Sequence, residues 1–572
     1  MKTVLGKIVG VHPAPERASR NLILLFWIIA VALLALEGWN GRFSMGWDGI
    51  QYLDEADLYW RGDCANAANS QWSPMYAWVL EAFLHVLHPP AYWEFPVVHL
   101  ANFFIAIFSL AGFQFFLSSL LRSMRGRLGS ITEWAVVVLG FSAFLYTTLD
   151  FTNVSVVTPD LLMHAFVYFV AGYLVRIVAG ERRMANFVVV GLLLGLGYLA
   201  KAPFFFYTFV YLAILFLVLG WNRRTVAKLA VAVAAFLLIA GPYIAFLSHW
   251  KHRLTYGDSG RYNVVWMLNG VPYYHWQGQP AGSGTPLHPT RQISTDPPAY
   301  EFAAPVAGTY PPWYDPIYWN EGARPHYRLG EFAAAAVRSG KYYEYLIHRR
   351  QLALLAGLLI LIVAIPRKML LARRLAANWA LLAFGLFPFV MYALVHQDSR
   401  FLSSFFVLVW MGLFAATLES MPGILTGVVR SVVIVVGALM LIECLIVATA
   451  KETPGTQDVS IAGTFPNPHW EVARQLTLLG IQAGDRVAVV GNHLPYFWAR
   501  LARVKIVSEV LLTDPACGGV GCEAESTARW LKVKDALAAT GAKVLVSPCV
   551  HGVVDQPGWA ELGGTGVFAY KF

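Results

Sequence analysis

Two aspartates stand where apolar stretches of this sequence meet polar ones. Asp48 follows the apolar run NLILLFWIIAVALLAL (21–36) at a short distance, and Asp160 directly precedes a second apolar segment, 161–178. A carboxylate that is fixed near a membrane surface and partly removed from water can take a proton from a substrate hydroxyl. Asp48 and Asp160 are therefore the first candidates for such chemistry. Two alternatives stay open, because Asp160 could simply cap the helix that follows it and Asp150 could take its place.

The segment around Asp48, GWDGIQYLDEADLYWRGD (46–63), contains four further acids. Its apolar residues recur at helical spacing, which predicts a helix that lies along the membrane surface. These apolar residues are Ile50, Leu53, Ala56 and Trp60. We expect Asp54, Glu55 and Asp57 to form a solvated face of this helix. Only Asp48 is then placed for chemistry.

Membrane-spanning helices must position these aspartates. The chain has 572 residues, of which 57% are hydrophobic and 13% charged, whereas about a quarter of the residues in a soluble domain are charged. A spanning helix needs roughly 20 predominantly apolar residues. The segments that approach this are 21–38, 97–120, 133–148, 161–178, 185–200, 203–220, 228–247, 350–366, 376–395, 402–418 and 431–450. The sequence therefore predicts a polytopic α-helical membrane protein with about eleven transmembrane helices.

Lys and Arg residues orient these spans, because cytoplasmic loops carry an excess of both. The basic groups that fall on one side of alternating spans are Lys2, Lys7, Arg17 and Arg20; Arg122, Arg125 and Arg127; Arg176, Arg182 and Arg183; Arg223, Arg224 and Lys228; and Arg367, Lys368, Arg373 and Arg374. The N-terminus is then cytoplasmic, and Asp48, Asp160 and the C-terminal region lie outside. The net charge of +9 comes mainly from these loops, so it implies no nucleic-acid partner.

Four ordered motifs resemble the GT-C superfamily, whose members are multispanning glycosyltransferases that use polyprenyl-phosphate-linked sugars. The most similar patterns are those of the lipid A aminoarabinose transferases and the protein O-mannosyltransferases. The matching segments are the loop from Asp48 with Tyr52, Leu53, Ala56, Gly62, SPMY (73–76) and WVLEAFLHVL (78–87); TPDL (158–161); GLLLGLGYLAKAP (191–203); and DSRFL (398–402). The resemblance spans about residues 48–402 and implies a GT-C fold.

The resemblance also implies roles for single residues. Asp48 would act as general base or help to hold a metal, and Asp160 would be a second candidate that orients the acceptor or shares the metal. Tyr76 would belong to the substrate loop, and Lys201 and Arg400 would bind the donor phosphate. Two further basic clusters, HWKHR (249–253) and HRR (348–350), lie on the predicted outer side, where the positive-inside rule expects few cations. Their candidates for the lipid phosphate are Lys251, Arg253, Arg349 and Arg350. Alternatively, these side chains snorkel and anchor the chain at headgroups.

The function implied is an inverting glycosyltransferase of a bacterial-type inner membrane, which moves a sugar from polyprenyl phosphate to a lipid, glycan or protein acceptor of the envelope. Asp48 lacks the adjacent second acid that many GT-C members carry, so a divalent cation (Mg, Mn or Zn) stays an open question. A lipid-linked-sugar flippase or transporter and a noncatalytic scaffold of envelope assembly are the alternatives. Transporters often contain internal repeats, and the sequence shows none, which counts against a transporter.

Two domains are expected: a GT-C transmembrane domain, 1–450, with outer loops 39–96 and 248–348, and an extracytoplasmic α/β domain, 451–572. The tail alternates predicted strands with predicted helices. The strands are DRVAVVG (485–491), VKIVSEV (504–510), AKVLVSP (542–548) and GVFAYKF (566–572), and the helices are HWEVARQLTLLG (469–480) and STARWLKVKDALAATG (526–541). The turn after the first strand lacks G-x-G-x-x-G, so nothing supports a dinucleotide site.

The long loop 248–348 is rich in proline, glycine and aromatic residues. Its aromatic motifs are VPYYHWQGQP (271–280), YPPWYDPIYW (310–319) and RPHYRLG (324–330). Aromatic rings can stack on sugars, so the loop could cover a substrate, and it could equally form an aromatic belt at the membrane interface.

Five cysteines add little to the functional interpretation. Cys517 and Cys522 are close enough in sequence for a local disulfide in an oxidising compartment, and no further ligands at zinc-site spacing are evident. Cys64 and Cys549 can pair only if the fold brings them together, and Cys444 is expected to be an inert thiol within the membrane.

Overall fold

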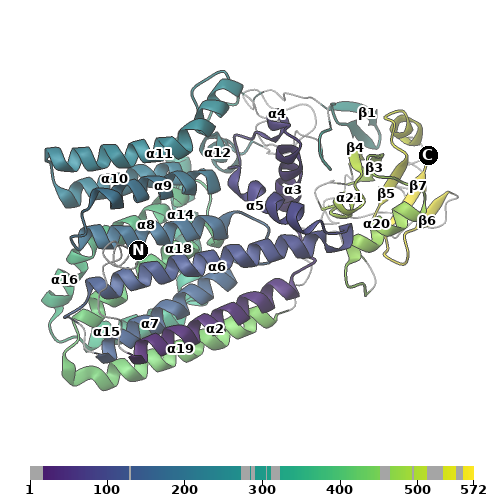
Figure 1. The fold of residues 1–572 in the computed structure, drawn as a ribbon. Coiled ribbons are helices and arrows are strands. Elements are labelled where there is room, and N and C mark those ends of the chain that lie inside the picture. Colours follow the sequence, from purple (N-terminus) through teal and green to yellow (C-terminus); the bar gives the residue numbers. More distant parts are fainter. Residues whose placement is uncertain are drawn as a thin grey trace, which may run out of the picture.

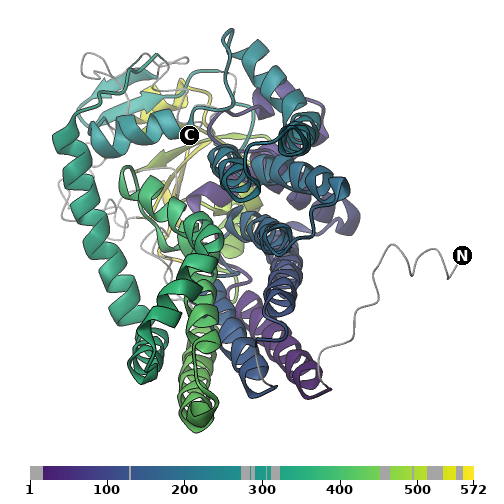
Figure 2. The same cartoon turned by 90° about the vertical axis from the view of Figure 1, so that its left-hand side faces the viewer.

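The structure is a computed structural model that describes residues 17–127, 130–271, 284, 290–304, 306–310, 322–450, 461, 464–491, 495–511, 533–548 and 558–572. A long helical bundle makes up most of it, and a mixed β-sheet with short covering helices lies at one end of the bundle (Figure 1). Seen from the end far from the sheet (Figure 2), several bundle helices point toward the viewer and the sheet lies behind them.

Each of the eleven predicted apolar segments coincides with a helix of the bundle, which confirms the predicted helical class. The bundle helices are α2 (Arg17–Asn40), α6 (Ala91–Ser123), α7 (Ser130–Tyr146), α8 (Asp160–Val178), α9 (Met184–Ala200), α10 (Phe204–Leu219), α11 (Arg223–Trp250), α14 (Leu329–Arg350), α15 (Leu352–Ala364), α16 (Lys368–Ala377), α17 (Trp379–Ala393), α18 (Ser399–Glu419) and α19 (Thr426–Thr449).

The helices that are long and apolar enough to span a membrane are fewer than the eleven spans that the sequence predicts. Within the described residues, 7 helices are long and apolar enough to cross a membrane, or up to 9 if each bent pair forms one span. The bent pairs are α14–α15, at 83°, and α16–α17, at 72°. Helices α9 and α10 have 17 and 16 residues, which is short of the roughly 20 that a bilayer core requires. A count of eleven spans therefore stays a prediction.

Small residues let neighbouring helices of the bundle approach closely. A Cβ atom at Gly191 of α9 would lie 2.2 Å from the carbonyl oxygen of Ala232 in α11, so only glycine fits at this crossing. Gly112 of α6 faces α8 in the same way, 2.8 Å from the carbonyl oxygen of Ala165. Such contacts replace the hydrophobic driving force that is missing within lipid.

The loops that carry the predicted cytoplasmic Lys and Arg residues share one end of the bundle. The α6–α7, α8–α9 and α10–α11 connections and helix α16 lie at the end far from the sheet (Figure 1). An alternating topology requires this arrangement. We call this end the inner end and the opposite one the outer end, although the side of a membrane that each faces stays a prediction.

Shorter elements cover the outer end of the bundle. They are α3 (Trp47–Trp60), α4 (Cys64–Ala67), α5 (Met75–Leu87), the π-helical turns η1 (Thr147–Thr152) and η2 (Val264–Leu268), α12 (Ser259–Asn263), α20 (Pro468–Leu478) and α21 (Trp498–Leu501), while the 3₁₀ turn η4 (Gly423–Leu425) precedes α19. Helix α3 confirms that the segment 46–63 contains a helix, and its placement along a membrane surface stays a prediction.

Seven strands form the sheet, in the order β1-β2-β4-β3-β5-β7-β6. The bounds are β1 (Arg291–Thr295), β2 (Pro298–Glu301), β3 (Arg486–Val490), β4 (Lys505–Val510), β5 (Val544–Ser547), β6 (Trp559–Glu561) and β7 (Phe568–Lys571). Strands β4, β3 and β5 are parallel, and the remaining pairs are antiparallel. The four strands predicted in the tail are confirmed as β3, β4, β5 and β7.

The sheet has two buried faces. Val487 and Val489 of β3 belong to the same hydrophobic core as the bundle, whereas Ala488 and Val490 belong to a separate, smaller core. Successive side chains of a strand point to opposite faces of the sheet, so neighbouring residues of β3 belong to different cores. This α/β unit, which we call the outer domain, is thus packed against the bundle through one face of its sheet.

Two strands of the sheet come from the long loop, a feature that the sequence did not predict. β2 pairs antiparallel with β4, with Tyr300 opposite Glu509, and β1 extends the sheet beyond it. Their sequences, RQIST and PAYE, are short and half polar, so they give only a weak strand signal. Residues 272–283 and 311–321, which hold most of the aromatic motifs, lie outside the described residues, as do Cys517, Cys522 and Cys549. Cys64 is exposed and Cys444 is buried, both as free thiols.

The prediction of a solvated acidic face on α3 is wrong. Asp54 and Glu55 are buried, and Asp57 forms an ion pair with Arg500 of α21. The outer domain covers this face of the helix, and a domain contact of this kind leaves no periodicity in the sequence of α3.

Candidate active site

Four elements bring four of the predicted residues together at the outer end of the bundle. Asp48 lies in the first turn of α3, and Asp160 is the first residue of α8. Lys201 is the C-cap residue that follows α9, and Arg400 is in the first turn of α18. We call these residues the outer charge cluster: Asp48, Asp160, Lys201 and Arg400.

Opposite charges alternate through the outer charge cluster. Lys201 Nζ donates a hydrogen bond to Asp160 Oδ1. Arg400 Nε lies 4.0 Å from Asp160 Oδ2, and Arg400 Nη2 lies 3.7 Å from Asp48 Oδ2. Arg400 therefore bridges the two carboxylates that the sequence singles out.

Exposure rises along the same line of residues. The Asp160 side chain is 1% exposed, Lys201 18%, Arg400 25% and Asp48 36%. Asp48 is thus the member that a substrate can reach, and Asp160 is the buried member that holds both cations. Helix α8 begins at Asp160 itself and Pro159 occupies the N-cap position, so Asp160 is not the residue that caps the helix.

Asp398 and Phe401, two residues of the DSRFL motif, fix the cations. Asp398 Oδ1 caps α18 by accepting a hydrogen bond from the Arg400 amide at 3.1 Å, and Oδ2 accepts one from Arg400 Nε at 3.1 Å. The Phe401 ring lies under Lys201 Nζ, 4.1 Å from it, and 5.2 Å from Arg400 Cζ. A cation above an aromatic face is attracted by the ring quadrupole, so the motif holds both cations in place.

His164 ties α8 to α18 beneath the cluster, and the sequence analysis did not single it out. Its Nδ1 is 2.7 Å from Ser404 Oγ, and its Nε2 is 2.8 Å from the Arg400 carbonyl oxygen. It follows Asp160 by one helical turn, which is the signal that could have identified it.

Tyr76 is buried below α3 rather than exposed in a loop. Its hydroxyl donates to Asn102 Oδ1 at 2.7 Å, and its ring packs edge-on against Tyr52 with 4.9 Å between centroids. Burial raises the pKa of Tyr52 well above its usual range, and the charges of Asp48 and Glu55 raise it further. Both tyrosines therefore stay neutral and support the start of α3, while a substrate contact for Tyr76 stays a prediction.

Three of the four remaining predicted cations contact groups outside the outer charge cluster. Arg253 Nη2 contacts Asp258 Oδ2 at 2.6 Å within the loop after α11, and Arg350 Nε donates to Asp150 Oδ2 at 3.0 Å. Lys251 Nζ lies 4.5 Å from the centre of the Trp250 ring, and Arg349 is exposed. Within the described residues, no ion pair joins any of these cations to the outer charge cluster.

A second buried charge cluster links the outer domain to α3 and α6. Arg500 of α21 is buried and pairs with three acids. Its Nε lies 2.7 Å from Glu94 Oε1, and its Nη1 lies 3.0 Å from Asp54 Oδ1 and 2.5 Å from Asp57 Oδ2. We call these four residues the Arg500 cluster. Sequence reasoning missed it because α21 is only four residues long and distant in sequence from α3.

The donor set at the outer charge cluster does not fit a divalent cation. Among the described residues, no group of three or more His, Cys, Asp or Glu side chains could hold a metal ion. Asp48 and Asp160 already face Arg400 and Lys201, and these cations would repel a further positive ion.

No family model matches the chain, and no curated protein matches its sequence. Among solved structures, the chain is similar to ArnT from Cupriavidus metallidurans bound to undecaprenyl phosphate, with a TM-score of 0.43, 13% identity, and 96% of this chain and 97% of that chain covered. For the apo state of the same protein the TM-score is 0.38 at 13% identity, with 95% and 97% covered. An Archaeoglobus fulgidus oligosaccharyltransferase in complex with Zn and sulfate gives 0.45 at 11% identity, with 92% and 67% covered. At such scores and identities these similarities establish neither family nor activity.

Proposed function

We propose that the protein is an inverting glycosyltransferase of the GT-C type, which transfers a sugar from a polyprenyl phosphate to an acceptor at the outer face of the membrane. One observation carries the proposal: four motifs far apart in the sequence place Asp48, Asp160, Lys201 and Arg400 in one alternating charge cluster. A positioned carboxylate beside two cations suits the removal of a proton from a hydroxyl and the departure of a phosphate.

Asp48 is the general base in this proposal. The acceptor hydroxyl loses its proton to the Asp48 carboxylate while its oxygen forms a bond to the anomeric carbon of the sugar. The bond between that carbon and the phosphate oxygen breaks on the opposite side, and the electron pair leaves with the phosphate. A single displacement of this kind inverts the anomeric configuration.

Arg400 and Lys201 are the partners proposed for the departing phosphate. Both are charged, partly exposed and aligned over Phe401, and Arg can bind two phosphate oxygens at once. Arg400 lies 3.7 Å from Asp48, so a phosphate that binds Arg400 competes with Asp48 for it. Donor binding would therefore draw Arg400 away from Asp48 and leave the carboxylate free to face the acceptor.

Asp160 is better suited to hold the two cations than to contact an acceptor. Its side chain is 1% exposed, and it pairs with Lys201 and Arg400 on its two oxygens. The flippase reading finds less support, because these charges lie at helix ends rather than near the middle of the bilayer.

A transfer assay tests the proposal. The purified full-length protein is incubated with a panel of radiolabelled polyprenyl-phosphate sugars and total envelope extract, and Asp48→Asn is compared with the wild type at equal folded yield. Asp63→Asn is the matched control, because Asp63 caps α4 through Asn66 and Asn is an equally good cap. Sugar transfer that Asp48→Asn loses and Asp63→Asn retains supports the proposed glycosyltransferase. Transfer that Asp48→Asn retains would refute the role of Asp48, and the absence of transfer from every donor would favour the scaffold or the flippase.

A further inference from the structure

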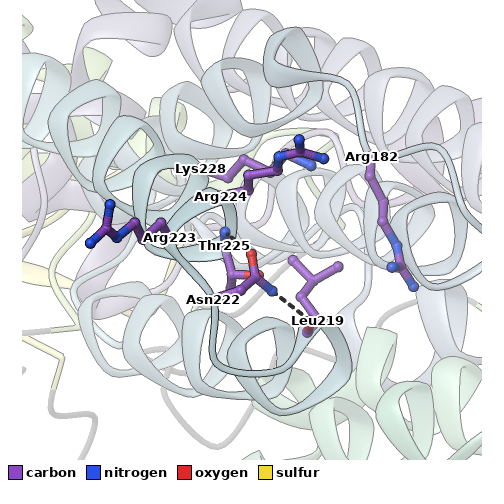
Figure 3. A pocket seen from close by; sticks show the side chains of 7 residues that line it. All are labelled: Arg182, Leu219, Asn222, Arg223, Arg224, Thr225 and Lys228. Atoms are coloured by element: carbon purple, nitrogen blue, oxygen red, sulfur yellow. Dashed lines mark hydrogen bonds between the residues drawn. The ribbon is translucent and has the colours of Figure 1, made fainter.

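A basic pocket lies at the inner end of the bundle, at the turn between α10 and α11 (Figure 3). Its volume is about 580 Å³. The residues that line it are Arg182, Leu219, Asn222, Arg223, Arg224, Thr225 and Lys228. Figure 3 shows Arg182 and Arg223 on opposite sides, with Arg224 and Lys228 between them. We call this the inner basic pocket.

The four cations of the inner basic pocket carry charge that no acid offsets. No acidic residue lines the pocket, and within the described part of the chain none of Arg182, Arg223, Arg224 and Lys228 forms an ion pair. The acid next in sequence to Arg182, Glu181, is held by Arg122 of α6 at 3.2 Å. Four like charges around one cavity repel each other, and a bound anion relieves this repulsion.

A side-chain cap orders the turn at which this cavity lies. Asn222 caps α11 by accepting a hydrogen bond from the Thr225 amide at 2.9 Å, and its amide group donates to Thr225 Oγ1 at 2.9 Å. The pocket also contains the first turn of α11, a helix of 28 residues, whose amides and dipole add to the attraction for an anion. These hydrogen bonds fix the backbone of the turn that carries Arg223 and Arg224.

Exposed apolar side chains lie close in sequence to the residues of the pocket, on α10, on the turn and on α11. Leu217 is 67% exposed, Trp221 83% and Val226 47%. These residues are where the acyl chains of a lipid would lie if its headgroup sat in the pocket, and an exposed Trp is typical of the membrane interface. The surroundings therefore favour a lipid over a soluble phosphate compound.

We propose that the inner basic pocket binds the headgroup of an anionic phospholipid that carries two phosphates or one phosphomonoester. A lipid with a single negative charge would leave most of the four positive charges unbalanced, whereas basic pockets between transmembrane helices commonly accept multiply charged headgroups. Helices α9 and α10 run between the outer charge cluster at Lys201 and this pocket, and with 17 and 16 residues each is about 25 Å long at 1.5 Å per residue. The pocket and the cluster therefore lie at opposite ends of the bundle. The lipid is a ligand separate from any donor or acceptor at that cluster.

Lipid-dependent thermal stability of the full-length protein tests this proposal. The protein in a neutral detergent is titrated with cardiolipin, phosphatidylglycerol or phosphatidylcholine, and with inorganic phosphate as a soluble arm. The pocket variant is Arg224→Gln with Lys228→Gln. The matched control is Arg373→Gln with Arg430→Gln, which removes two exposed cations of the same inner end from outside the pocket.

We expect cardiolipin to raise the unfolding temperature at lower concentrations than phosphatidylglycerol, with no effect of phosphatidylcholine. The pocket variant should need about 30-fold more cardiolipin for half of the effect, since each Lys or Arg near an anionic lipid contributes a factor of about five, and the control should match the wild type. An equal loss in the control variant, an equal effect of the three lipids, or an equal effect of inorganic phosphate would overturn the proposal. If the pocket variant does not fold, Arg182→Gln alone replaces it, and native mass spectrometry counts the retained cardiolipin.

Discussion

Arg500 of the outer domain and Asp57 of α3 form a bidentate ion pair. The Nη1 atom of Arg500 lies 2.5 Å from Asp57 Oδ2, and Nη2 lies 3.1 Å from Oδ1. Asp57 is nine residues after Asp48 on the same helix, so the domain holds the C-terminal half of the element whose first turn carries the proposed base. The sheet domain and the outer charge cluster are thus connected through one short helix.

Removing the Arg500 side chain should destabilise the contact between the outer domain and the bundle. Arg500→Met leaves Asp54, Asp57 and Glu94 without their shared partner, and breaking a buried ion pair in this way costs about 3–5 kcal/mol. Unfolding in denaturant and limited proteolysis of the domain measure the change. Arg474→Lys is the control, because Arg474 pairs with Glu471 on the exposed surface of α20, and it should behave as the wild type. A variant Arg500→Met as stable as the wild type would show that the cluster does not hold the domain.

The same contact should weaken in acid. Burial raises the pKa of Asp57, but the neighbouring Arg500 and Arg503 lower it by more, so that it lies below its usual value. A carboxyl group with a lowered pKa stabilises the fold fully above its unfolded pKa, about 3.9, and loses this stabilisation as the pH falls through the folded value. The difference in unfolding temperature between wild type and Asp57→Asn should be constant from pH 7 to about pH 5 and should shrink below about pH 4. A difference that grows on acidification would contradict the assignment.

Motifs at helix ends were predictable from the sequence, and contacts between distant domains were not. Asp160, Lys201 and Arg400 each adjoin an apolar run, and the length of the run determines where the helix leaves the membrane. The alternating direction of successive spans is then enough to predict that the three residues lie at the same end of the bundle. The burial of Asp54 depends on Thr309 and Arg500, which lie far away in the sequence. No period in α3 distinguishes an acid covered by a domain from an acid in water.

In variants of the Asp160–Lys201 ion pair, the stability of the protein should recover without recovery of sugar transfer. Asp160→Asn leaves Lys201 without its buried partner and should destabilise the protein, whereas the double variant Asp160→Asn with Lys201→Gln should recover most of the loss, because a neutral pair can replace a buried ion pair at little cost. Sugar transfer should remain abolished in the double variant, since one of the two phosphate partners is absent. Unfolding temperature and transfer rate are measured on the same preparations. Transfer that recovers together with stability would reduce both residues to a structural role.

Arg400→Lys should weaken donor binding more than it slows the chemical step. A Lys ammonium has no planar fork, so it cannot face Asp48, Asp160 and Asp398 at once and still bind two phosphate oxygens. We expect KM for the polyprenyl-phosphate sugar to rise about tenfold, equivalent to ~1.4 kcal/mol, with a smaller change in kcat. Asp48→Asn should show the reverse, a fall in kcat of about 10²–10⁴-fold with little change in KM. Steady-state kinetics with varied donor distinguish the two patterns, and the same pattern in both variants would contradict the division of roles.

Arg253→Gln and Arg350→Gln should leave KM for the donor unchanged, although both residues are cations of the outer end. Arg253 holds Asp258, which in turn accepts a hydrogen bond from Ser70 Oγ at 2.9 Å, and Arg350 holds Asp150 of η1. Because these charges are already used to join loops and helices, we expect their loss to lower the unfolding temperature. Arg349→Gln, which removes an exposed charge next to Arg350, should change neither property. A rise in donor KM for Arg253→Gln or Arg350→Gln without a loss of stability would return that residue to the phosphate-binding role that its sequence cluster suggests.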